Sequence, residues 1–328
     1  MAKVLITTVP FGDKNDLPIR QLEAAGIEYL INPLGRKLKE HELAEMVGDF
    51  EVLIAGTEVI SEKVMANAPR LKMISRVGIG LDSVDLLAAE RRGISVSYTP
   101  DAPAPAVAEL TIGLMFSLMR SIHVASAQMH RGVWHRYFGR RIPDLTIGVV
   151  GAGRIGGRVL QHLASLGAGR LLVSDINPEA CQLPPSLPVE WVDKDVVFRE
   201  ADIVSLHVPL TAQTKNMVRR EHLLQMKPDA MIINTARGGI INEDDLADVL
   251  ESGHLSGAAV DVFCEEPYKG RLASIERCVL TSHMGSMSID CRTRMEIEAT
   301  EEAIRFLTGT PLMGLVPEAE YTVQREGF

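Results

Sequence analysis

The chain is 328 residues long, with 46% hydrophobic and 23% charged residues, 27 glycines and 17 prolines. This composition excludes a disordered, collagen-like or coiled-coil protein, and the length suggests about two domains. The 34 basic and 43 acidic side chains give a formal net charge of −9. Because such a chain repels phosphate backbones and anionic lipid surfaces, we expect neither nucleic acid nor a membrane as a partner.

The cysteines indicate a reducing environment. They are Cys181, Cys264, Cys278 and Cys291, and no two of them form a C-x-x-C pair. Such sparse thiols do not make a disulfide framework in a chain of this length. The apolar run after Lys3 ends at Thr7, which is too short for a signal peptide. We therefore expect a cytoplasmic protein without a transmembrane span, and we identify no metal site.

Short β-rich runs alternate with helix-length segments along the chain, which predicts an α/β protein with doubly wound parallel sheets. In the N-terminal third the expected strands are 4–8, 29–31, 52–55, 73–75 and 96–97, and the expected helices include 61–68 and 85–92. A proline-rich break at 99–105 precedes a long apolar helix that should run to about residue 131. A domain boundary near residue 100 follows.

A second series of strands is expected at 147–150, 171–174, 203–207, 231–234, 258–262 and 279–281. Six strands at this rhythm are typical of a dinucleotide-binding fold. The last helix is expected over about 288–307, where Gly309 and Pro311 follow and stop it.

A glycine-rich turn follows the first strand of this series. Gly151, Gly153 and Gly156 form the pattern G-x-G-x-x-G before a helical stretch, in which the glycines permit a tight turn and a close approach of backbone N–H groups to a diphosphate. Alone, the pattern also fits an ordinary strand-to-helix turn. Asp175, 19 residues beyond Gly156, is placed to accept hydrogen bonds from a ribose, which favours NAD over NADP. Arg170 is the one neighbour that would tolerate the extra phosphate of NADP.

Three polar residues follow the ends of later strands, where ligands bind in open α/β sheets. They are Arg237, Glu266 and His283. Taken singly, Arg237 fits a solvated loop arginine and His283 a surface or core histidine. Their joint placement indicates a functional site.

The motifs at 75–85, 107–110, 148–156, 207–211, 234–238, 261–267 and 281–285 carry a family resemblance. The chain resembles the D-isomer-specific 2-hydroxyacid dehydrogenases, in particular the D-3-phosphoglycerate dehydrogenase-like branch. The resemblance implies a flavodoxin-like substrate domain, 1–99 plus 292–328, and a Rossmann NAD-binding domain, 100–291. It also implies a homodimer built by the basic and aromatic segment 120–141, with Trp134 as an anchor.

The same resemblance implies the chemistry. Arg237 would hold the carboxylate of a small anionic 2-oxo acid and polarise its carbonyl, because a guanidinium offers forked donors. His283 would exchange the proton of the 2-hydroxyl group. Glu266, rather than its neighbour Glu265, would orient the imidazole and favour its charged form.

Further cofactor contacts are implied at Arg154, Ile155, His207, Pro209, Thr235, Ala236, Asp261 and Gly285. Asp261 would either face the nicotinamide amide or be satisfied by backbone N–H groups of its own chain. His207 is expected to be a wall of the adenosine site and not a second base.

Substrate contacts are expected from Arg76, Val77, Gly78 and Ile79. The N–H groups of Gly78 and Ile79 would hold a carboxylate, and Arg76 would meet a second anionic group or be a plain surface arginine. Many phosphoglycerate-type relatives carry an arginine and a serine where Ala55 and Gly56 fall. The resemblance therefore leaves open a phosphorylated, a phosphonate-like or an unsubstituted 2-oxo acid as the substrate. The rival function is a nucleotide-sensing, corepressor-like binding protein, since fold alone does not separate the two.

Overall fold

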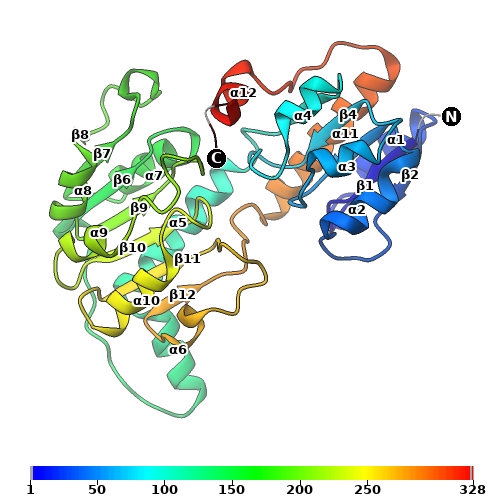
Figure 1. Ribbon diagram of the computed structural model, residues 1–328. Coiled ribbons are helices and arrows are strands. Elements are labelled where there is room, and N and C mark those ends of the chain that lie inside the picture. The colour runs from blue at the N-terminus through cyan, green and yellow to red at the C-terminus, as the bar shows by residue number, and fades with distance from the viewer. Residues whose placement is uncertain (1–2, 326, 328) are drawn as a thin grey trace. The chain divides into compact units, whose positions relative to one another are not determined.

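The computed structural model describes residues 3–325 and 327. They form two compact units (Figure 1): one combines the described residues up to Pro103 with those from Ser286 onward, and the other runs from Ala104 to Gly285. The predicted boundaries at 99/100 and 291/292 lie a few residues from these divisions. The first unit is therefore built from two separate stretches of chain.

The first unit contains a five-stranded parallel sheet. Its strands are β1 (Lys3–Ile6), β2 (Glu28–Ile31), β3 (Val52–Ala55), β4 (Met73–Arg76) and β5 (Ser95–Tyr98). They are ordered β2-β1-β3-β4-β5, which is the flavodoxin-like order. The direction of winding changes between β1 and β3, so this pair marks the switch point of the sheet.

The helices of this unit are α1 (Leu17–Ala24), α2 (Glu40–Met46), α3 (Glu62–Ala66), α4 (Leu86–Arg91), α11 (Ile289–Thr308) and α12 (Glu318–Arg325). Although α11 comes near the end of the chain, it packs on α1 and on the strands β3, β4 and β5. Helix α12 is not among the predicted elements. Its Gln324 accepts a hydrogen bond from the N–H of Leu86 at the start of α4 (2.9 Å), a long-range contact that local periodicity does not reveal.

The second unit contains a seven-stranded parallel sheet. Its strands are β6 (Thr146–Val150), β7 (Arg170–Ser174), β8 (Glu190–Trp191), β9 (Ile203–Leu206), β10 (Met231–Asn234), β11 (Gly257–Val260) and β12 (Cys278–Leu280). The order β12-β11-β10-β9-β6-β7-β8 is that of a Rossmann fold with its switch point between β6 and β9. The sequence predicts six of these strands, and it misses β8 because an exposed strand of two residues has no periodicity.

The helices of this unit are α5 (Ala104–Met119), α6 (Ile122–His130), α7 (Arg154–Ser165), α8 (Lys194–Glu200), α9 (Arg220–Gln225) and α10 (Glu243–Glu251). The prediction of one long helix to about residue 131 is wrong, because Ser121 takes the left-handed conformation (φ 50°) and the chain bends by 66° between α5 and α6. No single helix in the described part of the chain is long and apolar enough to cross a membrane, whereas this bent pair together has the necessary length and composition. Helix α5 packs on α7 and on β10, β11 and β12.

Candidate active site

The glycine-rich turn joins β6 to α7 and leaves room for a diphosphate. Gly151 has φ +92°, and a Cβ there would lie 2.5 Å from the carbonyl oxygen of His207. At Gly156 a Cβ would lie 1.9 Å from the Gly151 oxygen, whereas at Gly153 it would meet nothing within 4 Å. Packing thus requires glycine at 151 and 156, whereas Gly153 leaves the backbone of the turn accessible to a ligand. The turn fits a dinucleotide whose diphosphate sits at the N-terminus of α7.

Arg154 and Ile155 begin α7, the first exposed and the second half-buried. Asp175 directly follows β7, and its carboxylate is fixed by two backbone groups. Its Oδ2 accepts from the N–H of Ala152 in the glycine-rich turn (2.8 Å), and its Oδ1 accepts from the N–H of Asn177 (2.9 Å). Asp175, which is expected to contact the ribose, is therefore hydrogen-bonded to the glycine-rich turn, which is expected to contact the diphosphate.

Arg170, which could have tolerated the extra phosphate of NADP, is held elsewhere. It opens β7, so it lies at the opposite end of the strand from Asp175, about 16 Å along the chain direction. Its guanidinium donates to both oxygens of Glu190 (2.9 and 2.7 Å) and to Glu200 (2.6 Å). These two carboxylates raise the pKa of Arg170. The Arg170 guanidinium is therefore not at the position where it could bind the 2′-phosphate of NADP.

His207 follows β9 and lies against the glycine-rich turn. Its Nε2 and the Ser205 hydroxyl are 2.8 Å apart, and its Nδ1 is buried without a hydrogen-bond partner in the described part of the chain. Burial lowers the pKa of His207 to about 3, so the imidazole is neutral near pH 7. A buried, neutral imidazole is poorly suited to act as a second base, and the contact of His207 with the cofactor stays a prediction. Pro209, two residues on, is exposed.

The loop after β10 carries Thr235, Ala236 and Arg237. The side chain of Asn234 shapes it, because Oδ1 accepts from the N–H of Ala236 (3.1 Å) and Nδ2 donates to the carbonyl of Arg237 (2.9 Å). Thr235 is 5% exposed, and its hydroxyl lies 2.8 Å from that of Thr111 on α5. Arg237 is half-buried, and its Nη1 donates to the Ala236 carbonyl (2.7 Å).

His283 and Glu266 form a pair. The imidazole Nδ1 lies 2.9 and 3.0 Å from the two carboxylate oxygens of Glu266. Their side chains are 35% and 27% exposed, so the pair is reachable from solvent. Nε2 of His283 forms no hydrogen bond with any described residue. The predicted pairing with Glu266 is therefore present, whereas Glu265 is exposed.

Asp261 builds the loop that presents His283. This carboxylate is 1% exposed and accepts from the Thr281 hydroxyl (2.6 Å), the N–H of Met284 (2.9 Å) and the N–H of Gly285 (2.9 Å). Of the two roles left open by the sequence, the structure shows the one in which its own chain satisfies the carboxylate. The loop needs this support because His283 has a φ of 50°, which a non-glycine residue seldom adopts.

The two loops that carry these groups touch. A Cβ at Gly238 would lie 2.1 Å from the backbone of Phe263, and the N–H of Phe263 donates to Glu266 (3.2 Å). The residue after Arg237 is thus packed against the segment that supports Glu266. A guanidinium and an imidazole–carboxylate pair beside a dinucleotide site are typical of a dehydrogenase centre.

The expected substrate segment lies in the first unit, at the end of β4. Arg76 is 5% exposed, so it is not a surface arginine, and its Nη1 donates to the Val77 carbonyl. Val77 is buried and Ile79 half-buried. The N–H of Gly78, which is expected to hold a carboxylate, donates to the Thr99 hydroxyl (2.8 Å) in this structure, so its contact with a substrate stays a prediction. The N–H of Ile79 has no hydrogen-bond partner among the described residues.

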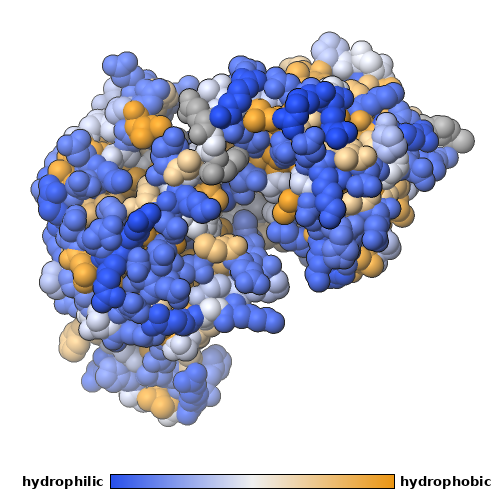
Figure 2. All heavy atoms as spheres, viewed as in Figure 1, coloured by the Kyte–Doolittle hydropathy of each residue, from blue (hydrophilic) through white to orange (hydrophobic). Residues whose placement is uncertain are grey.

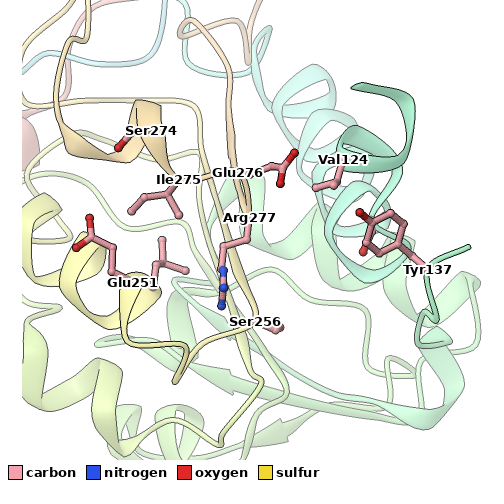
Figure 3. A pocket seen from close by; sticks show the side chains of 10 residues that line it. Val124, Tyr137, Glu251, Ser256, Ser274, Ile275, Glu276 and Arg277 are labelled. Carbon is pink, nitrogen blue, oxygen red and sulfur yellow. The ribbon is translucent and has the colours of Figure 1, made fainter. Parts of the chain in front are cut away.

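A cavity of about 500 Å³ lies elsewhere in the second unit. Figure 3 shows Val124 and Tyr137 on one side of it and Glu251 and Ile275 on the other, with Arg277 between them. None of its lining residues belongs to the predicted site. The cavity is therefore not where the chemistry is expected.

Sequence reasoning missed two residues that position this site. Asn234 was visible as the end of a strand and as the first residue of the motif 234–238, but without a role, and Thr111 only as a polar residue within an apolar helix. Their roles depend on contacts with Arg237 and Thr235. The Thr111 and Thr235 hydroxyls are 124 residues apart in the chain, which no local pattern could have linked.

Comparisons with known proteins identify the family of this chain. The family model of the D-isomer specific 2-hydroxyacid dehydrogenase NAD binding domain matches residues 112–285. A hydroxypyruvate reductase of Thermotoga maritima is 36% identical over 278 residues, which cover 82% of this chain and 89% of that protein. A D-3-phosphoglycerate dehydrogenase of Methanocaldococcus jannaschii is 35% identical over 94% of this chain, which spans only 58% of that relative.

Among solved structures, the TT0316 protein from Thermus thermophilus matches with a TM-score of 0.87 and 33% identity, over 96% of this chain and 100% of that one. The chain belongs to the D-isomer specific 2-hydroxyacid dehydrogenase family. It is an NAD-dependent enzyme of that family, as the sequence predicts. The hydroxypyruvate reductase and the D-3-phosphoglycerate dehydrogenase are enzymes, and they give no support to the corepressor-like alternative.

Proposed function

We propose that this enzyme transfers a hydride between NAD(H) and C2 of a small D-2-hydroxy acid or the corresponding 2-oxo acid. The observation that carries the proposal is the His283–Glu266 pair, in which Nδ1 is held by the carboxylate and Nε2 is left for a ligand. The names of the relatives, hydroxypyruvate reductase and D-3-phosphoglycerate dehydrogenase, support a short 2-oxo acid as the substrate.

Each side chain has a part in the proposed reaction. In the reductive direction His283 donates the Nε2 proton to the oxygen on C2, and Glu266 stabilises the imidazolium before that step. Arg237 binds the carboxylate and polarises the carbonyl, since its forked donors match that planar group. When bound, NADH would supply the hydride for the reduction, and NAD⁺ would accept it in the reverse direction. The residues that fit it are Gly151, Gly153, Gly156 and Asp175, with His207, Pro209, Thr235 and Ala236 beside them.

The test is NADH oxidation with hydroxypyruvate, glyoxylate, phosphohydroxypyruvate and 2-oxoglutarate at saturating cofactor. We expect turnover with at least one of them and a fall in kcat of about 100- to 10,000-fold in His283→Asn, with NADH affinity retained. Asparagine is the chosen replacement because it tolerates the left-handed backbone at this position. The exposed His41 on α2 gives the control His41→Asn. Full activity in His283→Asn would refute the assignment.

We also propose that the enzyme is a cytoplasmic homodimer that associates through the segment 120–141. Trp134 is 80% exposed and Phe138 fully exposed, although most of the face in Figure 2 is hydrophilic. Large apolar side chains with nothing to pack on are typical of an interface. Light scattering should show a dimer for the wild type and for Trp191→Ala, and a shift toward monomer for Trp134→Ala. A wild-type monomer would contradict the proposal.

A further inference from the structure

A buried carboxylate lies at the switch point of the first unit's sheet and is not part of the site described above. Glu58 follows β3 and is 1% exposed. Its Oε1 accepts from the Thr7 hydroxyl, which follows β1, and from the N–H of Gly56 (3.1 Å). Ligands of doubly wound sheets bind outside the carboxyl ends of the strands at this point.

No ion pair joins Glu58 to a cation among the described residues, and the buried Arg76 on the neighbouring strand β4 directs its Nη1 to the Val77 carbonyl. The nearest guanidinium in this network belongs to Arg292, which donates to the Thr8 hydroxyl (2.7 Å) and forms an ion pair with Glu296 (2.6 Å). The side chains of Arg292 and Glu296 are only 10% and 4% exposed. Because Glu296 cancels the charge of Arg292, the switch-point cluster of Thr7, Thr8, Glu58, Arg292 and Glu296 retains one net negative charge.

Glu58 also removes a donor that an anion would use. Backbone N–H groups at the ends of parallel strands are common anion ligands, and Gly56 offers one at the end of β3. That group is occupied by Glu58. Residue 56 must be a glycine for this contact to form, because a Cβ there would lie 2.9 Å from Glu58 Oε2 and 3.1 Å from the Cα of Thr8.

The carboxylate lies close to the segment expected to hold the substrate. Ala55 pairs with Arg76 in the sheet, and the N–H of Val77 donates to the Ala55 carbonyl (2.9 Å). Gly56 therefore lies one strand spacing from the substrate segment 76–79. This spacing puts Glu58 within roughly 10 Å of that segment. A buried charge acts over such a distance with little screening.

We propose that Glu58 is a specificity-determining residue, which makes the enzyme select 2-oxo acids with an uncharged distal end over those that carry a phosphate or a second carboxylate. The proposal rests on the proposed function, since it concerns the same substrate. Glu58 acts by its charge and by holding the Gly56 N–H, and it is not a catalytic residue.

The experiment compares kcat/KM for hydroxypyruvate and phosphohydroxypyruvate, which differ only in the distal phosphate. The wild type should prefer hydroxypyruvate. Glu58→Gln keeps the shape and the hydrogen-bond acceptor but removes the charge, and it should lower the preference about tenfold. Glu58→Asp keeps the charge and should therefore retain the wild-type preference for hydroxypyruvate. Glu62→Gln removes an exposed charge four residues on, at the start of α3, and should leave the preference unchanged.

A wild-type preference for phosphohydroxypyruvate would overturn the proposal, and this result needs no variant. An unchanged preference in a Glu58→Gln protein that melts like the wild type would overturn it as well. Failure of the proposed function is a different result, namely no NADH oxidation by the wild type with any 2-oxo acid.

Discussion

Both carboxylate oxygens of Glu266 lie within 3.0 Å of Nδ1 of His283. This bidentate approach fixes the imidazole plane and leaves Nε2 for the proton exchange proposed above. The imidazole is carried by a residue with a φ of 50°, and the loop around it is held by Asp261. The proposed acid–base group therefore depends on two acidic residues, one that binds the imidazole and one that holds its loop.

Glu266→Gln tests the first of these tasks. The amide oxygen still accepts from Nδ1, but the charge that stabilises the imidazolium is lost, so kcat should fall about 100-fold with little change in NADH affinity. Steady-state kinetics and NADH fluorescence titration measure the two quantities. Glu265→Gln, at the exposed neighbouring position, should behave as the wild type. Equal effects at the two positions would contradict the role given to Glu266.

Arg237→Lys should raise KM for the 2-oxo acid and lower kcat together. A lysine ammonium keeps the charge but cannot reproduce two parallel N–H donors toward a carboxylate. Initial-rate measurements across substrate concentrations separate the two parameters. The control is Arg199→Lys on the exposed face of α8. A kinetically silent Arg237→Lys would remove Arg237 from the site.

The cofactor preference should depend on Asp175 and not on Arg170. We expect the wild type to use NAD with higher kcat/KM than NADP, because the Asp175 carboxylate repels a 2′-phosphate. Asp175→Ser should narrow this preference at least tenfold, while Arg170→Ala leaves it unchanged because Arg170 lies at the far end of β7. A wild-type preference for NADP would contradict the assignment.

Asp261→Asn should destabilise the loop that presents His283. Two backbone N–H groups and one hydroxyl donate to this buried carboxylate, and an amide both loses the charge and turns a donor toward them. The expected loss is about 1.5–3 kcal/mol per hydrogen bond to the charged group. Urea unfolding of the protein without cofactor measures it, and kcat should fall in parallel. An unchanged free energy of unfolding would show that the loop does not depend on the hydrogen bonds to Asp261.

His207 predicts a pH dependence of stability. Its pKa is lowered to about 3 in the folded protein, against about 6.5 in an unfolded chain. Between these values the unfolded state binds more protons, so this residue makes the free energy of unfolding fall by roughly 1.4 kcal/mol per pH unit as the pH drops. His207→Gln should remove that part of the slope between pH 6.5 and 3.5. An identical slope in wild type and variant would contradict a buried neutral imidazole.

The sequence by itself determined the fold class, the dinucleotide site and the candidate catalytic triplet. The glycine spacing, Asp175 beyond it and the strand-end positions of Arg237, Glu266 and His283 are local patterns, and a parallel sheet brings its strand ends to one edge wherever the strands fall. The alternation of apolar and polar segments likewise predicted eleven of the twelve strands that the described residues form.

What only the tertiary structure decided are the contacts between residues distant in sequence. The break at Ser121, the helix α12, the use of Asp261 to hold its own loop and the occupation of the Gly78 N–H by Thr99 depend on partners that local periodicity does not specify. The same holds for Glu58, whose place between Thr7 and Gly56 arises because β1 and β3 are neighbours in the sheet. A residue type indicates what chemistry a side chain can perform, but only packing decides which groups are already satisfied and which remain for a substrate.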